Sequence, residues 1–541
     1  PTFFPHLLAF RPAHDYTRKM TPKFFTLLAG LLPLALPSAG HAEQADRRPN
    51  VLFIAVDDLK PMLGCYGDTV IKTPNIDRLA SHGTVFLNAH CQQAICGPTR
   101  ASLLTGLSPD STGIYDLKAK IRTLTSDVVT LPQYFKENGY QSVGLGKIFD
   151  PRNVEGYAKD DPQSWSRPYV QVGNNKDSAL GFLDPAFVAK VRAAAKEKGL
   201  KENQYDALSK AVGGKPVAEI NQDVPDSAYQ DGAMAVRAVA LMGELAKGPA
   251  PFFLAVGFQK PHLPFVAPKK YGDLYQDSDI RLEQFQKMPE GAPDFAFQPG
   301  WELRNGSYAG YTSADDSKES PIPEDRVEEQ KRMIHGYMAC VSYIDAQVGL
   351  LLDTLESKGI ADNTIVVLWG DHGFHLGDHG LWCKHTNYEQ ATRSPLIIAP
   401  KAAGGEGRKS EAPVEFIDIY PTLCQLAGLP IPAELQGLSL VPIMEGTAAK
   451  VKDVAVTQYP RGQGAEEMMG YAFRNGRYRY IEWVPKGQPN AEPKATELYD
   501  YETDPLEKKN LADDPAQYVI LENMRAAARD FHAKNPIRTG S

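Results

Sequence analysis

Three short apolar runs, each followed by a polar cluster, constrain the fold of this chain more than any other feature of its sequence. They span residues 51–56, 252–256 and 364–369 and show no polar alternation. Such runs are typical of strands buried on both faces, as in a parallel sheet covered by helices. Apolar residues at helical spacing between positions 333 and 355, with a stop at Gly359, predict one covering helix. The sequence therefore predicts an α/β fold with a large mixed, mostly parallel sheet flanked by helices.

The residues that follow these runs carry much of the polar chemistry. Asp57 and Asp58 follow the first run, His262 stands shortly after the second, and Asp371 and His372 follow the third. In open α/β sheets, ligands bind beyond the carboxyl ends of the strands. Each cluster alone could be a solvated loop, but together they predict a single functional site at one edge of the sheet.

Composition narrows the classes of function. Hydrophobic residues make up 43% and charged residues 23% of the 541 residues, which is typical of a globular protein and not of a disordered one. The 58 basic and 66 acidic residues give a net charge of −8, so we expect no nucleic-acid-binding surface. An anionic substrate would then need cations gathered locally at the site. Six cysteines are too few for a disulfide scaffold, and a large soluble enzyme is the interpretation that fits.

Residues 1–42 are interpreted as an upstream stretch followed by a secretory signal peptide, with Met20 as the expected start. A basic residue, the apolar segment 24–36 and the small residues Gly40 and Ala42 occur in the order of a cleavable signal. The alternative, a membrane anchor, needs about 20 apolar residues, and this segment is shorter and interrupted by proline. We expect a secreted or periplasmic protein with no membrane span in the mature chain.

The remaining chain is expected to form two parts. Residues 43–444 contain the apolar runs and form the expected catalytic domain. Residues 445–541, with alternating apolar positions and a final helix-like stretch, form a smaller α+β subdomain. Segments 151–230 and 270–330 are polar, rich in Pro and Gly, and only weakly periodic. We interpret them as insertions over the site, where substrate selection usually lies.

Cys96 opens the segment with the strongest signal. Pro98 suits the first turn of a helix, which places Cys96 at a helix N-terminus, where free N–H groups favour an anion. Arg100 adds a cationic fork in the same turn. A cysteine nucleophile with a lowered pKa and a buried structural cysteine both fit this position, and the position alone does not separate them.

The segment 96–106 resembles the signature of the type I sulfatases of the alkaline-phosphatase superfamily: Cys-Gly-Pro-Thr-Arg followed by Ala-Ser-Leu-Leu-Thr-Gly. Other motifs occur in the order of this family, at residues 48–50, 57–58, 73–80, 146–147, 260–262, 370–373 and 497–500. The iduronate-2-sulfatase-like branch is the most similar, as indicated by residues 92–94, 109–112, 260–265, 371–384 and 457–461. The resemblance covers most of the mature chain and implies a sulfuric ester hydrolase.

The resemblance implies a covalent modification at Cys96. In this family a maturation enzyme oxidises the cysteine to formylglycine, whose aldehyde hydrates to a geminal diol. One diol oxygen attacks sulfur, and deprotonation of the other expels sulfate and regenerates the aldehyde, which is covalent catalysis with its own release step. An unmodified serine or cysteine would leave a stable adduct that water must attack again.

The resemblance also implies one Ca²⁺ per chain. Its ligands would be Asp57, Asp58, Asp371, His372 and the formylglycine oxygen at Cys96. Carboxylates are hard oxygen donors, which favour Ca²⁺ or Mg²⁺ over metals that prefer soft ligands. A zinc cluster of His372 with His375 and His379 is the alternative, and the neighbouring carboxylates argue against it.

The remaining catalytic residues are assigned by the same resemblance. Arg100, Lys147 and Lys384 match positions that hold the sulfate and stabilise charge in the transition state. His262 matches the residue near the leaving oxygen and is the candidate general acid. Asp150 departs from the pattern, because the family usually has a histidine there. An aspartate, with an unperturbed pKa of about 4, is a weaker base and would repel sulfate.

Three functions follow from this reasoning. The first is hydrolysis of an O-sulfate ester on a sulfated sugar or a glycosaminoglycan-type polysaccharide fragment. The second is a phosphate or phosphonate monoester hydrolase of the same superfamily, since cationic side chains alone do not distinguish the two esters. The third is a non-catalytic protein that binds sulfated glycans and keeps an unmodified Cys96 thiol.

Overall fold

The computed structural model describes residues 48–155, 160–173, 175–201, 203–298, 300–305, 307–311 and 322–537. Residues 48–541 form one compact unit. The predicted signal peptide, within residues 1–42, lies outside the described residues, so its interpretation stays a prediction.

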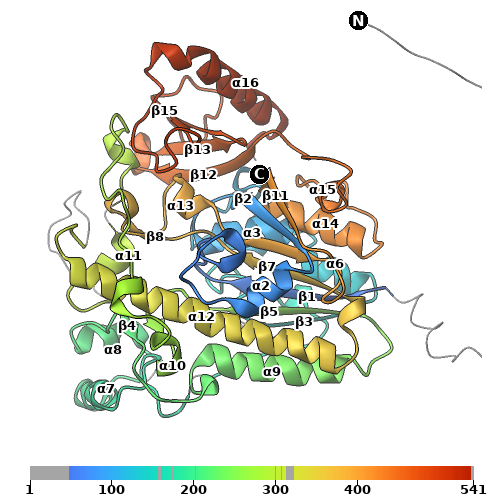
Figure 1. Cartoon of the computed structure of the whole chain (residues 1–541), viewed down its shortest axis with the longest axis vertical. Coiled ribbons are helices and arrows are strands. Elements are labelled where there is room, and N and C mark those ends of the chain that lie inside the picture. Colours follow the sequence, from blue (N-terminus) through green and yellow to red (C-terminus); the bar gives the residue numbers. More distant parts are fainter. Residues whose placement is uncertain are drawn as a thin grey trace, which may run out of the picture. The chain divides into compact units, whose positions relative to one another are not determined.

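A seven-stranded sheet forms the centre of the molecule (Figure 1). Its order is β11 (Arg408–Glu415), β2 (Thr84–His90), β10 (Leu396–Ala399), β7 (Thr364–Gly370), β1 (Asn50–Val56), β5 (Phe252–Phe258) and β3 (Gln141–Gly146). Only β10 pairs antiparallel with its neighbours, so the other six strands run in one direction. The three apolar runs form β1, β5 and β7, which confirms the predicted mixed, mostly parallel sheet.

The sheet separates two hydrophobic cores. Alternate residues of β1 enter opposite cores, with Ile54 and Val56 on one side and Phe53 and Ala55 on the other. The first core is closed by α2 (Pro74–Ala80), α9 (Gln230–Leu245) and α12 (Val327–Ser357). The second is closed by α3 (Cys96–Thr105), α6 (Leu131–Glu137) and α14 (Ile419–Leu426). Because both faces are covered, the strands are continuously apolar.

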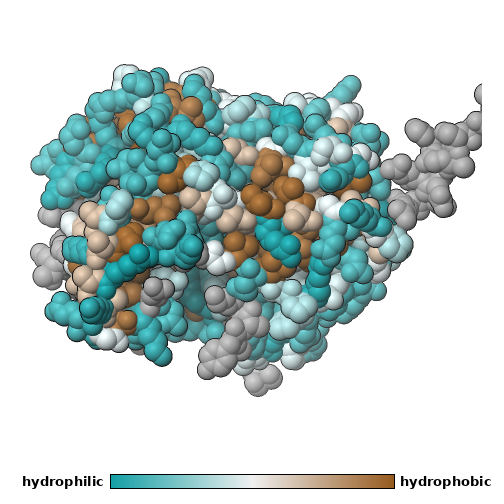
Figure 2. Space-filling view, turned by 90° about the horizontal axis from the view of Figure 1, so that it is seen from below, coloured by the Kyte–Doolittle hydropathy of each residue, from teal (hydrophilic) through white to brown (hydrophobic). Residues whose placement is uncertain are grey.

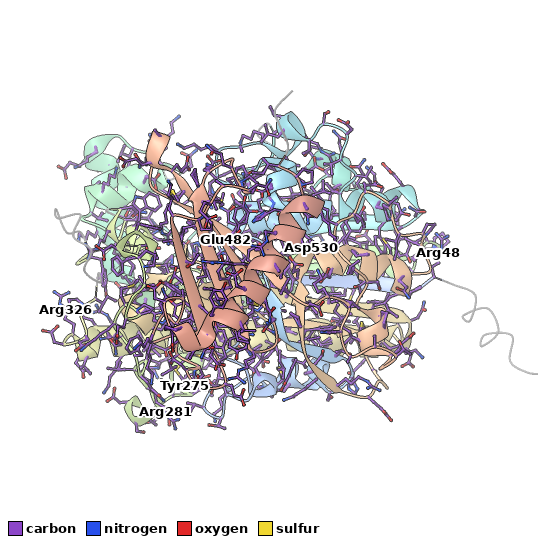
Figure 3. All side chains as sticks on the ribbon, turned by 90° about the horizontal axis from the view of Figure 1, so that it is seen from above. Arg48, Tyr275, Arg281, Arg326, Glu482 and Asp530 are labelled. Carbon is purple, nitrogen blue, oxygen red and sulfur yellow. The ribbon has the colours of Figure 1, made fainter. Side chains whose placement is uncertain are left out.

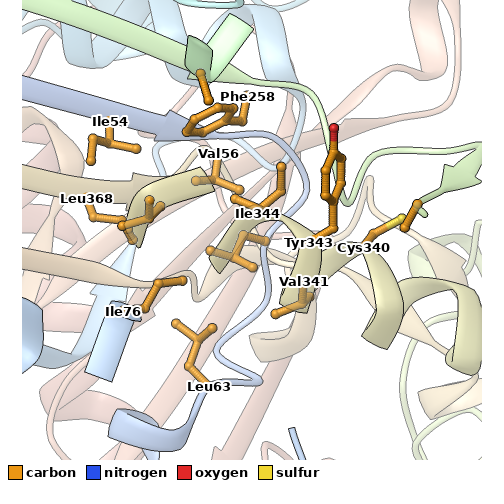
Figure 4. Close-up of a cluster of buried hydrophobic side chains, with 14 of the residues drawn as sticks. Ile54, Val56, Leu63, Ile76, Phe258, Cys340, Val341, Tyr343, Ile344 and Leu368 are labelled. Carbon is orange, nitrogen blue, oxygen red and sulfur yellow. The ribbon is translucent and has the colours of Figure 1, made fainter. Parts of the chain in front are cut away.

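Helix α12 is the predicted covering helix. Figure 4 shows Val341 and Ile344 of this helix in one cluster with Ile54, Val56 and Leu368 of the sheet. Among the described residues, α12 is the one helix long and apolar enough to cross a bilayer, and 83% of its most apolar window is buried in the protein. Such burial is typical of a core helix.

The outer surface of these helices carries both polar and apolar side chains. Seen from below, on the side where Figure 1 places α9 and α12, several apolar areas lie among hydrophilic side chains (Figure 2). Val236 of α9 and Leu350 of α12 are among the exposed apolar residues. The two helices are therefore amphipathic, with their apolar faces turned to the sheet.

Shorter elements lie in the loops that connect the sheet strands. The predicted insertions contain α7 (Pro185–Lys198), α8 (Tyr205–Ala211), β4 (Ala218–Glu219), α10 (Lys269–Gly272) and α11 (Trp301–Arg304). The others are α4 (Pro109–Thr112), α5 (Ile121–Leu124), β6 (Phe265–Val266), β8 (His375–Leu376), β9 (Trp382–Cys383), α13 (Glu389–Thr392) and α15 (Val441–Met444). Most of these elements have only two to seven residues, so their positions depend on contacts with the sheet and its helices.

The C-terminal part is a second, antiparallel sheet covered by one helix. Its strands are β12 (Ala455–Arg461), β13 (Met468–Arg474), β14 (Tyr478–Pro485) and β15 (Ala495–Asp500), and the helix is α16 (Tyr518–Lys534). In the view of Figure 3, Asp530 lies on α16 and Glu482 on the sheet beneath it. His532 Nε2 of α16 lies 2.7 Å from a Glu482 oxygen. The predicted α+β subdomain is confirmed, while its boundary near residue 445 stays a prediction.

Candidate active site

The polar clusters at the strand ends meet at one edge of the sheet. Beyond β1 and β7 the backbone pairing continues, with Asp371 N donating to Val56 O at 3.1 Å and Asp57 N to Phe258 O at 3.1 Å. Asp58 N donates to Asp371 Oδ1 at 2.9 Å. Parallel strands end on the same side, so residues more than 300 positions apart in the sequence become neighbours.

Three buried carboxylates form the centre of this edge, and each is held by a cation. Lys147 Nζ lies 2.7 Å from Asp57, and Lys384 Nζ lies 2.8 Å from both oxygens of Asp58. Burial opposes ionisation of Asp57, yet Lys147 and Arg100 together hold the pKa of its carboxyl well below its usual range. Charged groups this deeply buried are stable only as a connected set.

Arg100 connects two of these carboxylates. Its Nη2 lies 3.2 Å from Asp57 Oδ1 and its Nε 3.0 Å from Asp371 Oδ2. Its Nη1 donates to the carbonyls of Lys147 and Ile148. The guanidinium is fully buried, and its donors are directed at the protein itself, so Arg100 fixes the relative positions of the strand ends that carry Asp57, Asp371 and Lys147.

Cys96 is the first residue of α3, as the sequence predicts. The residue is 1% exposed, and its Sγ lies 3.4 Å from His372 Nε2. Burial, with the nearby Asp57 carboxylate, raises the pKa of the Cys96 thiol well above its usual value. The interpretation of a thiol with a lowered pKa is therefore not favoured. Thr99, one turn along α3, donates from Oγ1 to Asp371 O at 2.9 Å and ties the helix to β7.

The donor atoms around Cys96 fit a hard divalent cation. One group contains Asp57, Asp58, Cys96 and His262, and a second contains Cys96, Asp371 and His372, with all ligand atoms of each group within 4.8 Å of one another. His372 Nδ1 lies 2.9 Å from Gly373 O. A carbonyl can only accept, so Nδ1 carries a proton, and Nε2, which lies 3.5 Å from Asp58 Oδ1 and 3.6 Å from Asp371 Oδ1, is the ring atom that can bind a metal ion. A cation satisfies that arrangement.

The backbone and the charges of the carboxylates support the same conclusion. Asp58 has a φ of 60°, a left-handed conformation that costs about 1–2 kcal/mol for a residue with a Cβ and that is concentrated at functional sites. Burial raises the pKa of both Asp58 and Asp371. Crowded carboxylates with raised pKa values are stabilised in their ionised form by a bound cation.

His262 and Glu302 line the exposed side of the cluster. His262 Nδ1 lies 2.6 Å from Leu263 O, so Nε2 is the ring atom left to face the site, and its side chain is 26% exposed. Glu302 lies 3.2 Å from His262 Nε2 and 3.2 Å from Lys384 Nζ. The sequence analysis did not identify Glu302, because it lies in α11 within a polar insertion where nothing in the spacing marks it.

Asp150 is buried beside the cationic residues but is already paired. Its carboxylate accepts from Arg152 Nε at 2.8 Å and Arg152 Nη2 at 2.7 Å, and its Oδ2 lies 3.7 Å from Lys147 Nζ. Burial opposes its ionisation, but Arg152 and Lys147 hold the pKa of Asp150 well below its usual range. Arg152, which the sequence analysis did not single out, is therefore part of the site.

The other histidines of this loop form a separate cluster. His375 bonds to Asp378 through Nδ1 and lies 2.8 Å from Thr386 Oγ1 through Nε2. His375, Asp378 and His379 group together without His372, which belongs to the Cys96 group. Among the described residues, the zinc triad considered from sequence is therefore not assembled. His375 instead supports the segment that carries Lys384.

Comparisons with known proteins agree with this geometry. The family model "Sulfatase" matches residues 49–429, and the model "N-sulphoglucosamine sulphohydrolase, C-terminal" matches residues 377–534. Iduronate 2-sulfatase of Mus musculus is 33% identical, over 93% of this chain and 97% of its own length.

Two solved structures show the same fold. A 2-O GAG sulfatase superposes with a TM-score of 0.64 at 23% identity, covering 90% of this chain and 93% of its own. A phosphonate monoester hydrolase of Agrobacterium radiobacter superposes with a TM-score of 0.68 at 22% identity, covering 90% and 96%. Fold likeness at this identity does not separate the two reactions, whereas the family model and the 33% identical relative do. This chain belongs to the sulfatase family and is a sulfuric ester hydrolase.

Proposed function

We propose that the enzyme hydrolyses the O-sulfate ester of a sulfated sugar, on a glycosaminoglycan-type fragment. One observation carries the proposal: Cys96, three carboxylates and the ammonium groups of Lys147 and Lys384 converge at one sheet edge. The relative at 33% identity acts, by its name, on iduronate 2-sulfate, and the two chains match over nearly their full length. The insertion residues Glu302 and Arg152 extend the site toward a substrate larger than sulfate itself.

Two groups that the family implies fit the residues present. Asp57, Asp58, Asp371 and His372 would hold Ca²⁺, which as a Lewis acid would polarise a sulfate oxygen. Formylglycine formed from Cys96 by a maturation enzyme would supply, as its hydrate, one oxygen for attack on sulfur and another whose deprotonation releases sulfate. The hard-oxygen donor set with His372 Nε2 beside it supports the first, and the position of Cys96 inside that set supports the second.

The chain's own residues bind the substrate and move its protons. Lys147 and Lys384 carry rotatable N–H groups beside the buried carboxylates and would hold the sulfate oxygens. Arg100, which bonds to the protein through four of its five N–H donors, would orient Asp57 and Asp371. Burial and Lys384 lower the pKa of His262, so His262 would first take up a proton at Nε2, where Glu302 lies at 3.2 Å, and would then donate that proton to the leaving sugar oxygen. Asp150, held ionised by two cations, would be a poor base.

Sulfate release from defined sulfated disaccharides tests the proposal. We expect turnover of sulfated sugars and aryl sulfates, with aryl phosphates turned over far more slowly. Faster turnover of the phosphate than of any sulfate ester would contradict it.

Removal of the divalent ion should lower both activity and stability. After treatment with EDTA, we expect sulfate release to fall at least tenfold, and the Tm to fall as well. An ion present at 100 times its Kd contributes about 2.7 kcal/mol to folding. Added Ca²⁺ should restore both quantities, measured by sulfate release and by thermal unfolding. Restoration by Zn²⁺ and not by Ca²⁺ would mean that the ion is wrongly assigned.

His262→Gln should affect poor leaving groups most. A sugar alkoxide needs a proton to leave, whereas nitrophenolate does not, so we expect kcat to fall about 10²- to 10⁴-fold on a sulfated sugar and far less on nitrophenyl sulfate. His335→Gln is the control, because His335 lies on α12 with Nε2 at 2.9 Å from Gly272 O, outside the site. Equal losses on both esters would show that His262 is not the acid.

Export of the mature enzyme is also part of the proposal, on the basis of the order of basic, apolar and small residues before Glu43. N-terminal sequencing of protein recovered outside the cytoplasm should begin near Glu43.

A further inference from the structure

Arg152 holds an exposed cationic edge at the mouth of the site. Its side chain is 52% exposed, while the Asp150 carboxylate that it binds is completely buried. Asp150 uses the Nε–H and one Nη2–H of the guanidinium. A guanidinium has five N–H donors. Among the described residues no bond to Nη1 is recorded, so the edge formed by Nη1 and Nη2 presents a two-pronged donor to solvent.

This edge is rigidly placed. Arg152 N donates to Asp150 Oδ1 at 3.0 Å, and Arg152 O accepts from Lys120 Nζ at 2.6 Å. The next residue, Asn153, donates through Nδ2 to Asp116 O at 2.8 Å and to Ala119 O at 2.7 Å. With its backbone fixed on both sides and its side chain fixed by Asp150, Arg152 loses little conformational entropy when it binds a ligand.

The segment that carries Arg152 lies against the turn that carries Cys96. A Cβ placed on Gly97 would lie only 1.9 Å from Asn153 Oδ1, so the two segments are in direct contact there. Asp150 Oδ2, to which Arg152 Nη2 donates, lies 3.7 Å from Lys147 Nζ. The Asp150 carboxylate therefore lies between the guanidinium of Arg152 and the ammonium group of Lys147, which would hold the reacting sulfate.

We propose that Arg152 binds a second anionic group of the substrate, an oxyanion separate from the sulfate that is cleaved; this inference rests on the proposed function. The buried Asp150 carboxylate neutralises the positive charge of Arg152, which would otherwise add to that of Lys147. Its two hydrogen bonds also orient the free edge of the guanidinium toward solvent. A planar fork of two parallel N–H groups matches a carboxylate bidentately, and it also binds sulfate. The substrate class is thus an O-sulfated sugar with a uronate carboxylate or a second sulfate near the scissile ester.

A purely structural role for Arg152 makes a different prediction. Arg152 could serve only to pair with Asp150, so that the Asp150 carboxylate does not compete with sulfate for Lys147. In that case its loss would weaken binding of the sulfate that is cleaved, and it would slow every sulfate ester equally. A subsite for a second anion instead gives a loss that depends on the substrate. The variant Asp150→Asn with Arg152→Gln removes both charges together, so it leaves Lys147 with its Asp57 partner and isolates the missing fork.

The experiment compares matched substrates on the wild type, on Arg152→Gln and on the double variant. One pair is a sulfated uronate disaccharide and its methyl ester; the other is a disulfated and a monosulfated hexosamine. Loss of a hydrogen-bonded ion pair corresponds to about 10- to 100-fold in affinity. For both variants, we expect the loss of kcat/KM to be about 10- to 100-fold larger on the doubly anionic member of one pair than on its singly anionic partner. Most of this difference should come from a higher KM. The pair that responds identifies the second anion.

Arg477→Gln is the matched control, because Arg477 binds Asp500 in the same bidentate way, at 2.7 Å and 2.7 Å, in the C-terminal sheet. It should discriminate between the substrates as the wild type does. A wild type that releases no sulfate from any ester would overturn the proposed function and the subsite with it. An active wild type whose Arg152 variants lose the same factor on both members of each pair would overturn the subsite alone.

Discussion

Cys96→Ala should abolish sulfate release, with kcat lower by at least about 10⁴-fold, the range seen when a nucleophile is removed from an enzyme that retains its binding groups. The residue is the first of α3 and is enclosed by Asp57, Asp371 and His372. Binding by Lys147 and Lys384 would persist in the variant, so a sulfated sugar should still bind while no sulfate is released. Sulfate release and a binding isotherm on the same preparation measure the two effects separately.

Cys424→Ala is the control for this result. Cys424 is fully buried in α14 within the second hydrophobic core, so its truncation removes the same volume from the protein interior. We expect turnover within a fewfold of the wild type and a Tm close to that of Cys96→Ala. Turnover retained by Cys96→Ala would mean that another group attacks sulfur.

Arg100→Gln should lower both stability and activity. Removing one partner of a buried ion pair costs about 3–5 kcal/mol, and here Asp371 loses its cationic partner while Asp57 keeps only Lys147. Since Arg100 also sets the spacing of these carboxylates, we expect kcat/KM to fall by at least about 10²-fold. Denaturant unfolding gives the first quantity, and initial rates well below the Tm give the second.

Arg479→Gln separates the two effects of that substitution. Arg479 is equally buried and pairs with Glu389 and Glu507, between the C-terminal sheet and α13. We expect a comparable loss of stability with kcat/KM changed only fewfold. If Arg100→Gln kept its activity while losing stability, Arg100 would be a structural residue only.

The part of the site that follows strands could be predicted from the sequence. Asp57, Asp58, Asp371 and His372 stand directly after continuous apolar runs, and a parallel sheet must bring such strand ends together. The order of the motifs likewise identified Cys96, Arg100, Lys147, His262 and Lys384. These residues could be identified because they stand in local sequence motifs or at the ends of predicted strands, and both features can be recognised in a single sequence.

The outer part of the site could not be predicted in the same way. Glu302 reaches His262 and Lys384 from a four-residue helix, α11, inside a polar insertion. Arg152 is positioned by its pairing with Asp150, two residues away, a contact that i, i+2 spacing in a loop does not specify. Such contacts are fixed by tertiary packing of irregular segments, for which hydrophobic periodicity provides no signal.

The central claim concerns the side chain at position 96, and peptide mass spectrometry of the active enzyme tests it most directly. The account predicts an aldehyde at residue 96, detected by its mass and by reaction with a carbonyl-specific hydrazide, while the other five cysteines remain thiols. Protein that releases sulfate at full rate with an unmodified thiol at Cys96 would contradict the account.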